Sequence, residues 1–432
     1  MIQLCRRQKK AFLGLTLTLL ALVPCMLLWL RNGYKAHPGI SRKETSRQQT
    51  TTSESDSGEY DSYHGDITSP PILGYTSDVK YLLPLLEYNW NEDGCWMEQM
   101  RYATQIAIHF NRTIATVPLR THGGDTKSSK MVHFDSAFDG NMLSKVLNVV
   151  TVTDFREFCG SNLSSDSLVI DPSWSSESTW TELVTVYDGY RSVYEESLGI
   201  LLPELTSISR PESEYQYHLN SLNNKPCVAL YHPNKVNIEV VETEIVRAAL
   251  GLSKAAYIRE LVDALVEKLC GGDPFLAVHW RNKTGESCLA VNVCEGDMLE
   301  DVQTLIKLSP NISDAIIDYM NDMNSTCIYV SHPPFEQQIL VDLKSKLSVE
   351  RIITQADVTR FAEMKSYADH TNVISLIEQE ICLRARVFLP WFTKDAWSSY
   401  VATERHAHGL PTKGLSDLPQ MPKEALSFKW LL

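Results

Sequence analysis

The sequence lacks the short motifs that identify several large classes of enzyme. It contains no Gly-x-Ser-x-Gly element and no P-loop, so neither a serine hydrolase nor a P-loop nucleotidase is indicated. It has no Cys-x-x-Cys pair, which argues against a zinc or dithiol site. No Asp-x-Asp triplet occurs and the 12 histidines are scattered, so we expect no metal and no cofactor.

Positive charge is also scarce. The formal net charge is −13, and no basic stripe stands out after the first ten residues. Nucleic acid is therefore not an expected partner, because its phosphates require clustered Lys and Arg. The chain ends in Lys-Trp-Leu-Leu and has no KDEL-type retrieval signal, which favours Golgi residence over soluble residence in the ER.

One long uncharged run lies close to the N-terminus. Residues 11–30 carry no charged side chain, and twenty helical residues at about 1.5 Å each span roughly the 30 Å core of a bilayer. The tail before them, residues 1–10, holds four Lys or Arg, and positive charge stays on the cytoplasmic side. We therefore predict a single-pass type II signal-anchor in a Golgi or ER membrane, with the catalytic mass in the lumen. A cleaved signal peptide is the alternative, although the run is longer than a usual signal core.

Two further features fit a luminal location. Eight cysteines follow the anchor, an even number that indicates disulfides whose pairing cannot be read from the sequence. There are also five N-glycosylation sequons, at Asn111, Asn162, Asn282, Asn311 and Asn324. Because sequons also arise by chance, they support this location without establishing it.

Beyond the anchor the composition changes once more. Residues 31–71 are rich in Ser, Thr, Gln, Glu and Asp and cannot bury enough apolar surface to order themselves. We predict that they form a disordered luminal stem. The remainder is long enough for two domains, which we place at 72–250 and 251–432.

Strand and helix patterns alternate along that remainder. In the first half, a helix is expected from near Trp96, strands at 113–117, 148–152 and 227–231, and a helix over 253–270. In the second half, strands are expected at 275–280, 327–330, 351–354 and 387–389, with helices at 298–308, 335–345, 373–385 and 397–408. This alternation predicts an α/β fold with doubly wound, mostly parallel sheets, whose ligands bind beyond the carboxyl ends of the strands.

Two such places lie in the second half. The tripeptide His279-Trp280-Arg281 closes a strand, where a guanidinium suits phosphate oxygens; an arginine paired with a surface carboxylate is the commoner case. The loop Pro390–Trp397 precedes the last helix, and Thr393 or Asp395 can cap N–H groups that attract an anion. An ordinary capped helix explains that loop equally well.

A third place lies in the first half. The segment Asn91–Gly94 precedes the first long helix, and Gly94 permits a tight turn there. Glu92 and Asp93 stand where a general base could meet an acceptor hydroxyl. Acidic residues that simply favour a helix N-terminus are the commoner explanation.

Several longer stretches resemble one known family when they are taken in order. They are HFNRTIATVP, which ends at Pro118, HFDSAFDGNML with Asp139, FLAVHWRNKTGESC from Phe275, CIYVSHPPF from Cys327, IEQEICLRARVFL from Ile377, and Glu404-Arg405. Together these motifs resemble the GDP-fucose protein O-fucosyltransferases over most of residues 72–408. The resemblance implies a GT-B-like architecture, with two Rossmann-like domains facing a cleft, and an inverting, metal-independent transfer.

The resemblance also implies roles for particular residues. Arg281 corresponds to the arginine of the family's His-x-Arg motif, which holds the β-phosphate of GDP-fucose and assists departure of GDP. Glu92 and Asp93 fall where some members place a proposed base. The residues implied to bind the donor are His279, Arg281, Gly94, Thr393, Asp395, Ala396, Trp397, Ser398 and Ser399.

This chain also departs from the family pattern. The asparagine of a Gly-x-Asn element is missing after Gly94, and the family's Ala-Thr-Asp reads Ser331-His332-Pro333. Our first hypothesis is a luminal fucosyltransferase that moves fucose from GDP-fucose to a Ser or Thr hydroxyl of a secretory protein, or to a glycan hydroxyl. The second is an inactive member that binds a glycan or protein. A third is a related transferase that uses another nucleotide sugar.

Overall fold

The computed structural model describes residues 79–86, 93–120, 131–170, 177–204, 216–233, 238–280, 296–333, 337–367, 370–391 and 395–426. Residues Ser77–Leu432 form one compact unit. The predicted tail, anchor and stem lie outside the described residues. None of the helices within the described ranges is long and apolar enough to cross a membrane.

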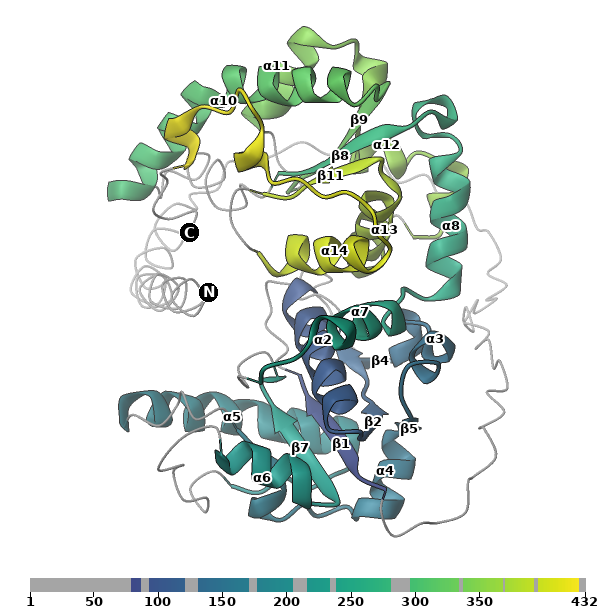
Figure 1. Cartoon of the computed structure of the whole chain (residues 1–432), viewed down its shortest axis with the longest axis vertical. Coiled ribbons are helices and arrows are strands. Elements are labelled where there is room, and N and C mark those ends of the chain that lie inside the picture. Colours follow the sequence, from purple (N-terminus) through teal and green to yellow (C-terminus); the bar gives the residue numbers. More distant parts are fainter. Residues whose placement is uncertain are drawn as a thin grey trace, which may run out of the picture. The chain divides into compact units, whose positions relative to one another are not determined.

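A five-stranded sheet is built from the first half of this unit (Figure 1). Its order is β5-β2-β1-β7-β6, and all its pairings are parallel. The strands are β1 (Tyr81–Leu85), β2 (Thr113–Thr116), β5 (Val149–Thr151), β6 (Leu168–Val169) and β7 (Cys227–Tyr231). The central strand β1 was not predicted, and it contains Pro84, which removes one ladder N–H. Its buried leucines hold it between β2 and β7 all the same.

A second parallel sheet comes from the other half, in the order β10-β9-β8-β11. Its strands are β8 (Phe275–His279), β9 (Cys327–Ser331), β10 (Ile352–Thr354) and β11 (Val387–Leu389), all at positions where strands were predicted. Every residue of β8 and β9 is buried, as expected for parallel strands that are covered on both faces. The parallel α/β fold is therefore confirmed. A cleft between the sheets stays a prediction.

Helices cover both faces of the second sheet, and the two faces belong to different hydrophobic cores. Leu276 and Val278 pack with α10 and α11, whereas Phe275 and Ala277 pack with α13 and α14. The helices are α2 (Asp93–His109), α3 (Gly140–Ser144), α4 (Val152–Cys159), α5 (Glu177–Leu198), α6 (Gln216–Asn224), α7 (Glu242–Gly251), α8 (Ala256–Val266), α10 (Gly296–Asp322), α11 (Gln338–Lys346), α12 (Gln355–Val358), α13 (Thr371–Arg384) and α14 (Ala396–Ala407). Two short strands, β3 (Leu119–Arg120) and β4 (Met131–Val132), pair separately.

Two helix boundaries differ from the prediction. The helix expected to stop before Pro310 continues through it to Asp322. A proline inside a helix costs about 3 kcal/mol, yet Leu305 and Ile312, on either side of Pro310, are both buried in the same core and keep the helix continuous. The second difference concerns α2, which begins at Asp93. The turn expected at Gly94 is therefore wrong, because Gly94 lies in the first turn of the helix.

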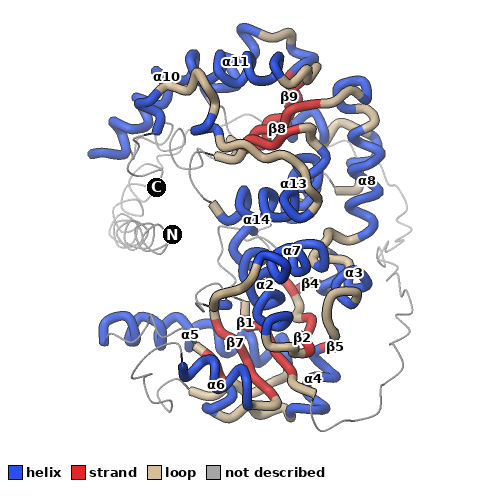
Figure 2. Tube along the Cα trace, in the orientation of Figure 1, coloured by secondary structure: helices blue, strands red, loops and turns tan. Residues whose placement is uncertain are grey.

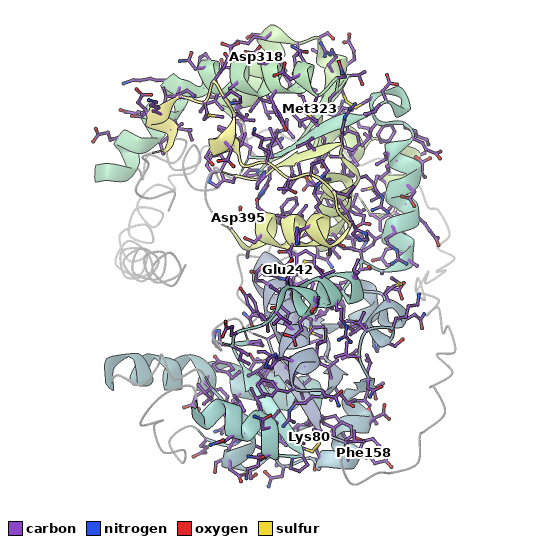
Figure 3. All side chains as sticks on the ribbon, in the orientation of Figure 1. Lys80, Phe158, Glu242, Asp318, Met323 and Asp395 are labelled. Atoms are coloured by element: carbon purple, nitrogen blue, oxygen red, sulfur yellow. A yellow bond between two sulfur atoms is a disulfide. The ribbon has the colours of Figure 1, made fainter. Side chains whose placement is uncertain are left out.

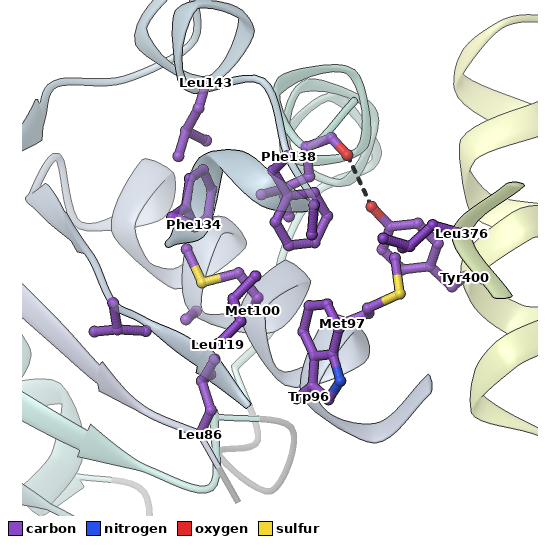
Figure 4. Packing of buried hydrophobic residues seen from close by; sticks show 14 of the residues in the cluster. Leu86, Trp96, Met97, Met100, Leu119, Phe134, Phe138, Leu143, Leu376 and Tyr400 are labelled. Carbon is purple, nitrogen blue, oxygen red and sulfur yellow. Dashed lines mark hydrogen bonds between the residues drawn. The ribbon is translucent and has the colours of Figure 1, made fainter. Parts of the chain in front are cut away.

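Helices α13 and α14 also join the second sheet to the first half of the chain. They lie beside α2, α7 and α8 (Figure 2). Figure 4 shows Tyr400 of α14 packed near Trp96, Met97 and Phe138, with its hydroxyl donating to the carbonyl oxygen of Leu252 at 2.8 Å. One continuous core therefore spans both halves, and α14 is held by residues from each.

The disulfides predicted from the cysteine count are confirmed in part. Cys159 pairs with Cys227, and Cys270 pairs with Cys327 at the start of β9. Cys382, on α13, is a buried free thiol. The side chains of Cys95, Cys288 and Cys294 lie outside the described part of the chain.

Candidate active site

His279 occupies the carboxyl end of β8, the edge at which ligands of parallel sheets bind. Strand alternation turns its side chain to the face that α13 and α14 cover. Its Nδ1 lies 2.6 Å from Ser398 Oγ and 3.7 Å from Asp395 Oδ2, both at the start of α14. Two of the three predicted places thus meet, because a strand end and a helix start that are more than 110 residues apart share one cluster.

Asp395 is the N-cap of α14 (Figure 3). It is one of the two residues that were predicted to cap this helix. Its Oδ1 accepts the backbone N–H of Ser398 at 2.8 Å, and its carbonyl oxygen accepts that of Ser399. A carboxylate here neutralises part of the positive end of the helix dipole. A phosphate at this helix start would meet Asp395 as well as free N–H groups, which is unusual for an anion site.

Trp397 connects this cluster to α13. Its ring stacks on that of His279, with centroids 4.2 Å apart. Its Nε1 donates to Ser375 Oγ at 3.2 Å. Ala396 is only partly buried, whereas Ser398 is almost fully buried, so the predicted residues of this loop differ in accessibility.

Two residues to which the sequence analysis gave no role in the site complete the cluster. Ser331, at the end of β9, pairs in register with His279. Its hydroxyl hydrogen-bonds to the carboxyl group of Glu378 on α13, which also accepts a hydrogen bond from Tyr329 at 2.8 Å. Burial raises the pKa of Glu378 to about 7. The one signal in the sequence that could have identified Glu378 is its position among apolar residues of a predicted helix.

A third acidic residue approaches from α2. Glu98 is 4% exposed, and its Oε1 accepts Arg101 Nη2 at 2.6 Å. Burial raises its pKa, Arg101 opposes this, and repulsion from Asp395 adds to the rise. Arg101 also donates to Thr403 Oγ1 of α14 at 3.1 Å. The first half of α2 therefore packs along α14.

The remaining predicted residues cannot be placed in this cluster. Arg281, Glu92 and Thr393 lie outside the described residues, and of Asp93 only the helical backbone is described. Their roles stay predictions. In the described part of the chain no group of three His, Cys, Asp or Glu side chains could hold a metal ion.

The raised pKa of Glu378 predicts how stability changes with pH. Its pKa rises from 4.5 to about 7 on folding, so the folded chain binds the extra proton between these values. The stability from this group is complete below pH 4.5 and is lost as the pH rises through 7. In the wild type, this group should lower the free energy of unfolding by about 2 kcal/mol between pH 5 and 8. We expect Glu378→Gln to abolish that decrease, as measured by urea unfolding at each pH. Burial also raises the pKa of Glu404, so the variant should still lose some stability as the pH rises. If Glu378→Gln leaves the dependence of the free energy of unfolding on pH unchanged, the assignment is contradicted.

The family model described as GDP-fucose protein O-fucosyltransferase matches residues 98–408. The structure is similar to that of POFUT1 in complex with GDP, with 14% identity, 79% of this chain and 99% of that chain covered, and a TM-score of 0.51. It is similar to apo POFUT1 at 13% identity, 79% and 99% coverage and a TM-score of 0.50. The fucosyltransferase NodZ from Bradyrhizobium is 14% identical, with 75% of this chain and 93% of that chain covered and a TM-score of 0.38. A search of curated protein sequences gives no significant match.

The two parallel sheets thus have the fold of the POFUT1 structure. Because the family model matches more than half of the chain, the chain belongs to the GDP-fucose protein O-fucosyltransferase family and is a glycosyltransferase. The matched segment includes His279 and the start of α14. It begins at Glu98, so Glu92, Asp93 and Gly94 precede it.

Proposed function

We propose that this chain transfers fucose from GDP-fucose to a hydroxyl group, and that the cluster at the end of β8 binds the diphosphate end of the donor. The observation that carries the proposal is the contact of His279 with Ser398 and Trp397. It brings a strand end and a helix start together at the edge where parallel sheets bind nucleotides. Family membership supplies the identity of the donor.

The chemistry requires stabilisation of a leaving diphosphate. As the bond to fucose breaks, negative charge grows on the β-phosphate, and a fixed positive group lowers the energy of that state. Arg281, two residues beyond His279, is the group we assign to this role, and it makes a metal unnecessary. We assign inverting transfer, in which the acceptor hydroxyl attacks opposite GDP and loses its proton to a carboxylate, for which Glu92 and Asp93 are the candidates.

The acceptor and the location also belong to the proposal. The uncharged run 11–30 and the basic tail before it support a type II anchor in a Golgi or ER membrane. The disulfides agree with an oxidising lumen. The acceptor is then a Ser or Thr hydroxyl of a secretory protein, or a glycan hydroxyl.

The test is the release of GDP from GDP-fucose by the purified chain, with donor binding measured by calorimetry. We expect binding and GDP release that a metal chelator does not abolish. His279→Phe preserves the ring beside Trp397 but removes Nδ1, and we expect about tenfold weaker GDP binding from the lost hydrogen bond. Donor binding without turnover on a panel of proteins and glycans would indicate an inactive binding member. No binding of GDP or GDP-fucose would refute the proposal and call for other nucleotide sugars.

A further inference from the structure

Glu98 and Arg101, both on α2, form a buried ion pair that leaves one polar atom unused on each side chain. Glu98 is 4% exposed and Arg101 is 7% exposed. The guanidinium donates through Nη2 to Glu98 Oε1 at 2.6 Å and through Nη1 to Thr403 Oγ1 at 3.1 Å. Glu98 Oε2 and Arg101 Nε are also buried, and neither has a hydrogen-bond partner in the described part of the chain. Because a buried polar atom without a partner is costly, the pair calls for a third group.

The two unused atoms define the chemistry of that group. An arginine and a carboxylate commonly meet as a fork, with two parallel N–H···O bonds. Here a single N–H···O contact is made, so one acceptor and one donor remain at the same contact. A hydroxyl group satisfies both, because it can donate to the carboxylate and accept from the guanidinium. An anion would be repelled by Glu98 and a cation by Arg101. The pair therefore fits a neutral hydroxyl.

The pair also lies near the cluster assigned to the donor. Its helix packs along α14, whose start carries Asp395 and Ser398 of that cluster. Met97, the residue before Glu98, lies beside Tyr400 of α14 (Figure 4). Burial raises the pKa of Glu98, Arg101 opposes this, and the charge of Asp395 adds to the rise, as expected for carboxylates that lie near each other. A sugar joined to a diphosphate at the start of α14 would therefore lie close to the pair.

We propose that Glu98 and Arg101 bind a ring hydroxyl of the donor sugar, which donates to Glu98 Oε2 and accepts from Arg101 Nε. The inference rests on the proposed function, which places the diphosphate at the start of α14. A carboxylate repels phosphate oxygens, so Glu98 faces an uncharged part of the donor. The sugar is the uncharged part bonded directly to the diphosphate, and it carries several hydroxyls. The pair thus distinguishes a sugar nucleotide from the free nucleotide.

A buried water molecule is the competing explanation. Water also donates and accepts hydrogen bonds, and ordered waters commonly satisfy buried polar atoms in protein interiors. In that case the pair would only join α2 to Thr403 of α14. Its loss would then weaken the binding of GDP and of GDP-fucose alike, because neither ligand would touch it.

The affinities of GDP and GDP-fucose separate these explanations. We would measure both by calorimetry for the wild-type chain, Glu98→Gln and Arg101→Lys. Lysine maintains the charge beside Glu98 but lacks the Nε–H group. The wild type should bind GDP-fucose about tenfold more tightly than GDP, as expected for a hydroxyl bound by charged partners. Each variant should bring this ratio close to unity, with the affinity for GDP itself within about twofold of the wild type.

The control is Arg384→Lys, which changes a partly buried arginine that pairs with Glu380 and Asp263 at the end of α13. It should leave the ratio unchanged. Equal weakening of both ligands by Glu98→Gln and Arg101→Lys, with the ratio preserved, would overturn the inference and assign the place to water. Equal affinities of the wild type for GDP and GDP-fucose would overturn it too. Both results would leave the proposed function intact, because GDP still binds.

Failure of the wild type to bind GDP at all would overturn both the inference and the proposed function. Thermal melts of each variant would show that the ratios come from folded protein. Since Glu98→Gln and Arg101→Lys remove different partners of the same hydroxyl, the ratio from either folded variant is sufficient for the test.

Discussion

Replacing Arg281 by lysine is expected to lower the kcat for fucose transfer by about 100-fold, with a smaller effect on GDP-fucose binding. The size follows from the loss of a charge-stabilising donor in the transition state, on the order of 3 kcal/mol. Lysine maintains the charge but cannot offer two parallel N–H groups to a phosphate. Initial rates of GDP release at saturating acceptor and donor would measure it.

The matched control is Arg360→Lys, at an exposed arginine whose ion pair is with Asp357. It should leave kcat within about twofold, since an exposed pair is worth at most about 1 kcal/mol and lies outside the cluster. An Arg281→Lys enzyme with normal kcat would contradict the assignment, even if the chain still binds GDP. Unchanged kcat would direct attention to Lys394 as the cation of the site.

Lys254→Met is expected to cost about 3–5 kcal/mol of the free energy of unfolding, because it leaves buried carboxylates without their cation. Lys254 is 0% exposed and lies between α7 and α8. It forms an ion pair with Glu404, lies 3.7 Å from Glu380 Oε2, and places Nζ 4.7 Å from the ring centroid of Tyr400. All three partners belong to α13 or α14. The lysine therefore holds the helix that carries Ser398 against the first half of the chain.

Urea unfolding of single and double variants would test this role. Lys268→Met removes the exposed ion pair with Glu363 and should cost less than about 1 kcal/mol. The double variant Lys254→Met with Glu404→Gln should recover a large part of the loss, because the stranded carboxylate is removed together with its cation. Additive losses in the double variant, or a Lys254→Met cost equal to that of Lys268→Met, would refute the role.

The sequence by itself determined the elements of the second sheet. All four strands of that sheet lie where short apolar runs predicted them, because strands buried on both faces require continuous apolar residues. The same local rules failed at Pro84 and Pro310. Each proline weakens its element locally, and only packing against distant residues outweighs that cost.

The sequence also identified His279 and the start of α14 as separate candidates, since strand ends and capped helix starts have local signals. Only the tertiary structure decided that they meet, because contact between residues 119 positions apart has no local signature. Glu378 and Lys254 were not predicted for a related reason. Their partners come from other strands and helices, so a charge that is costly in isolation becomes informative only once its surroundings are folded.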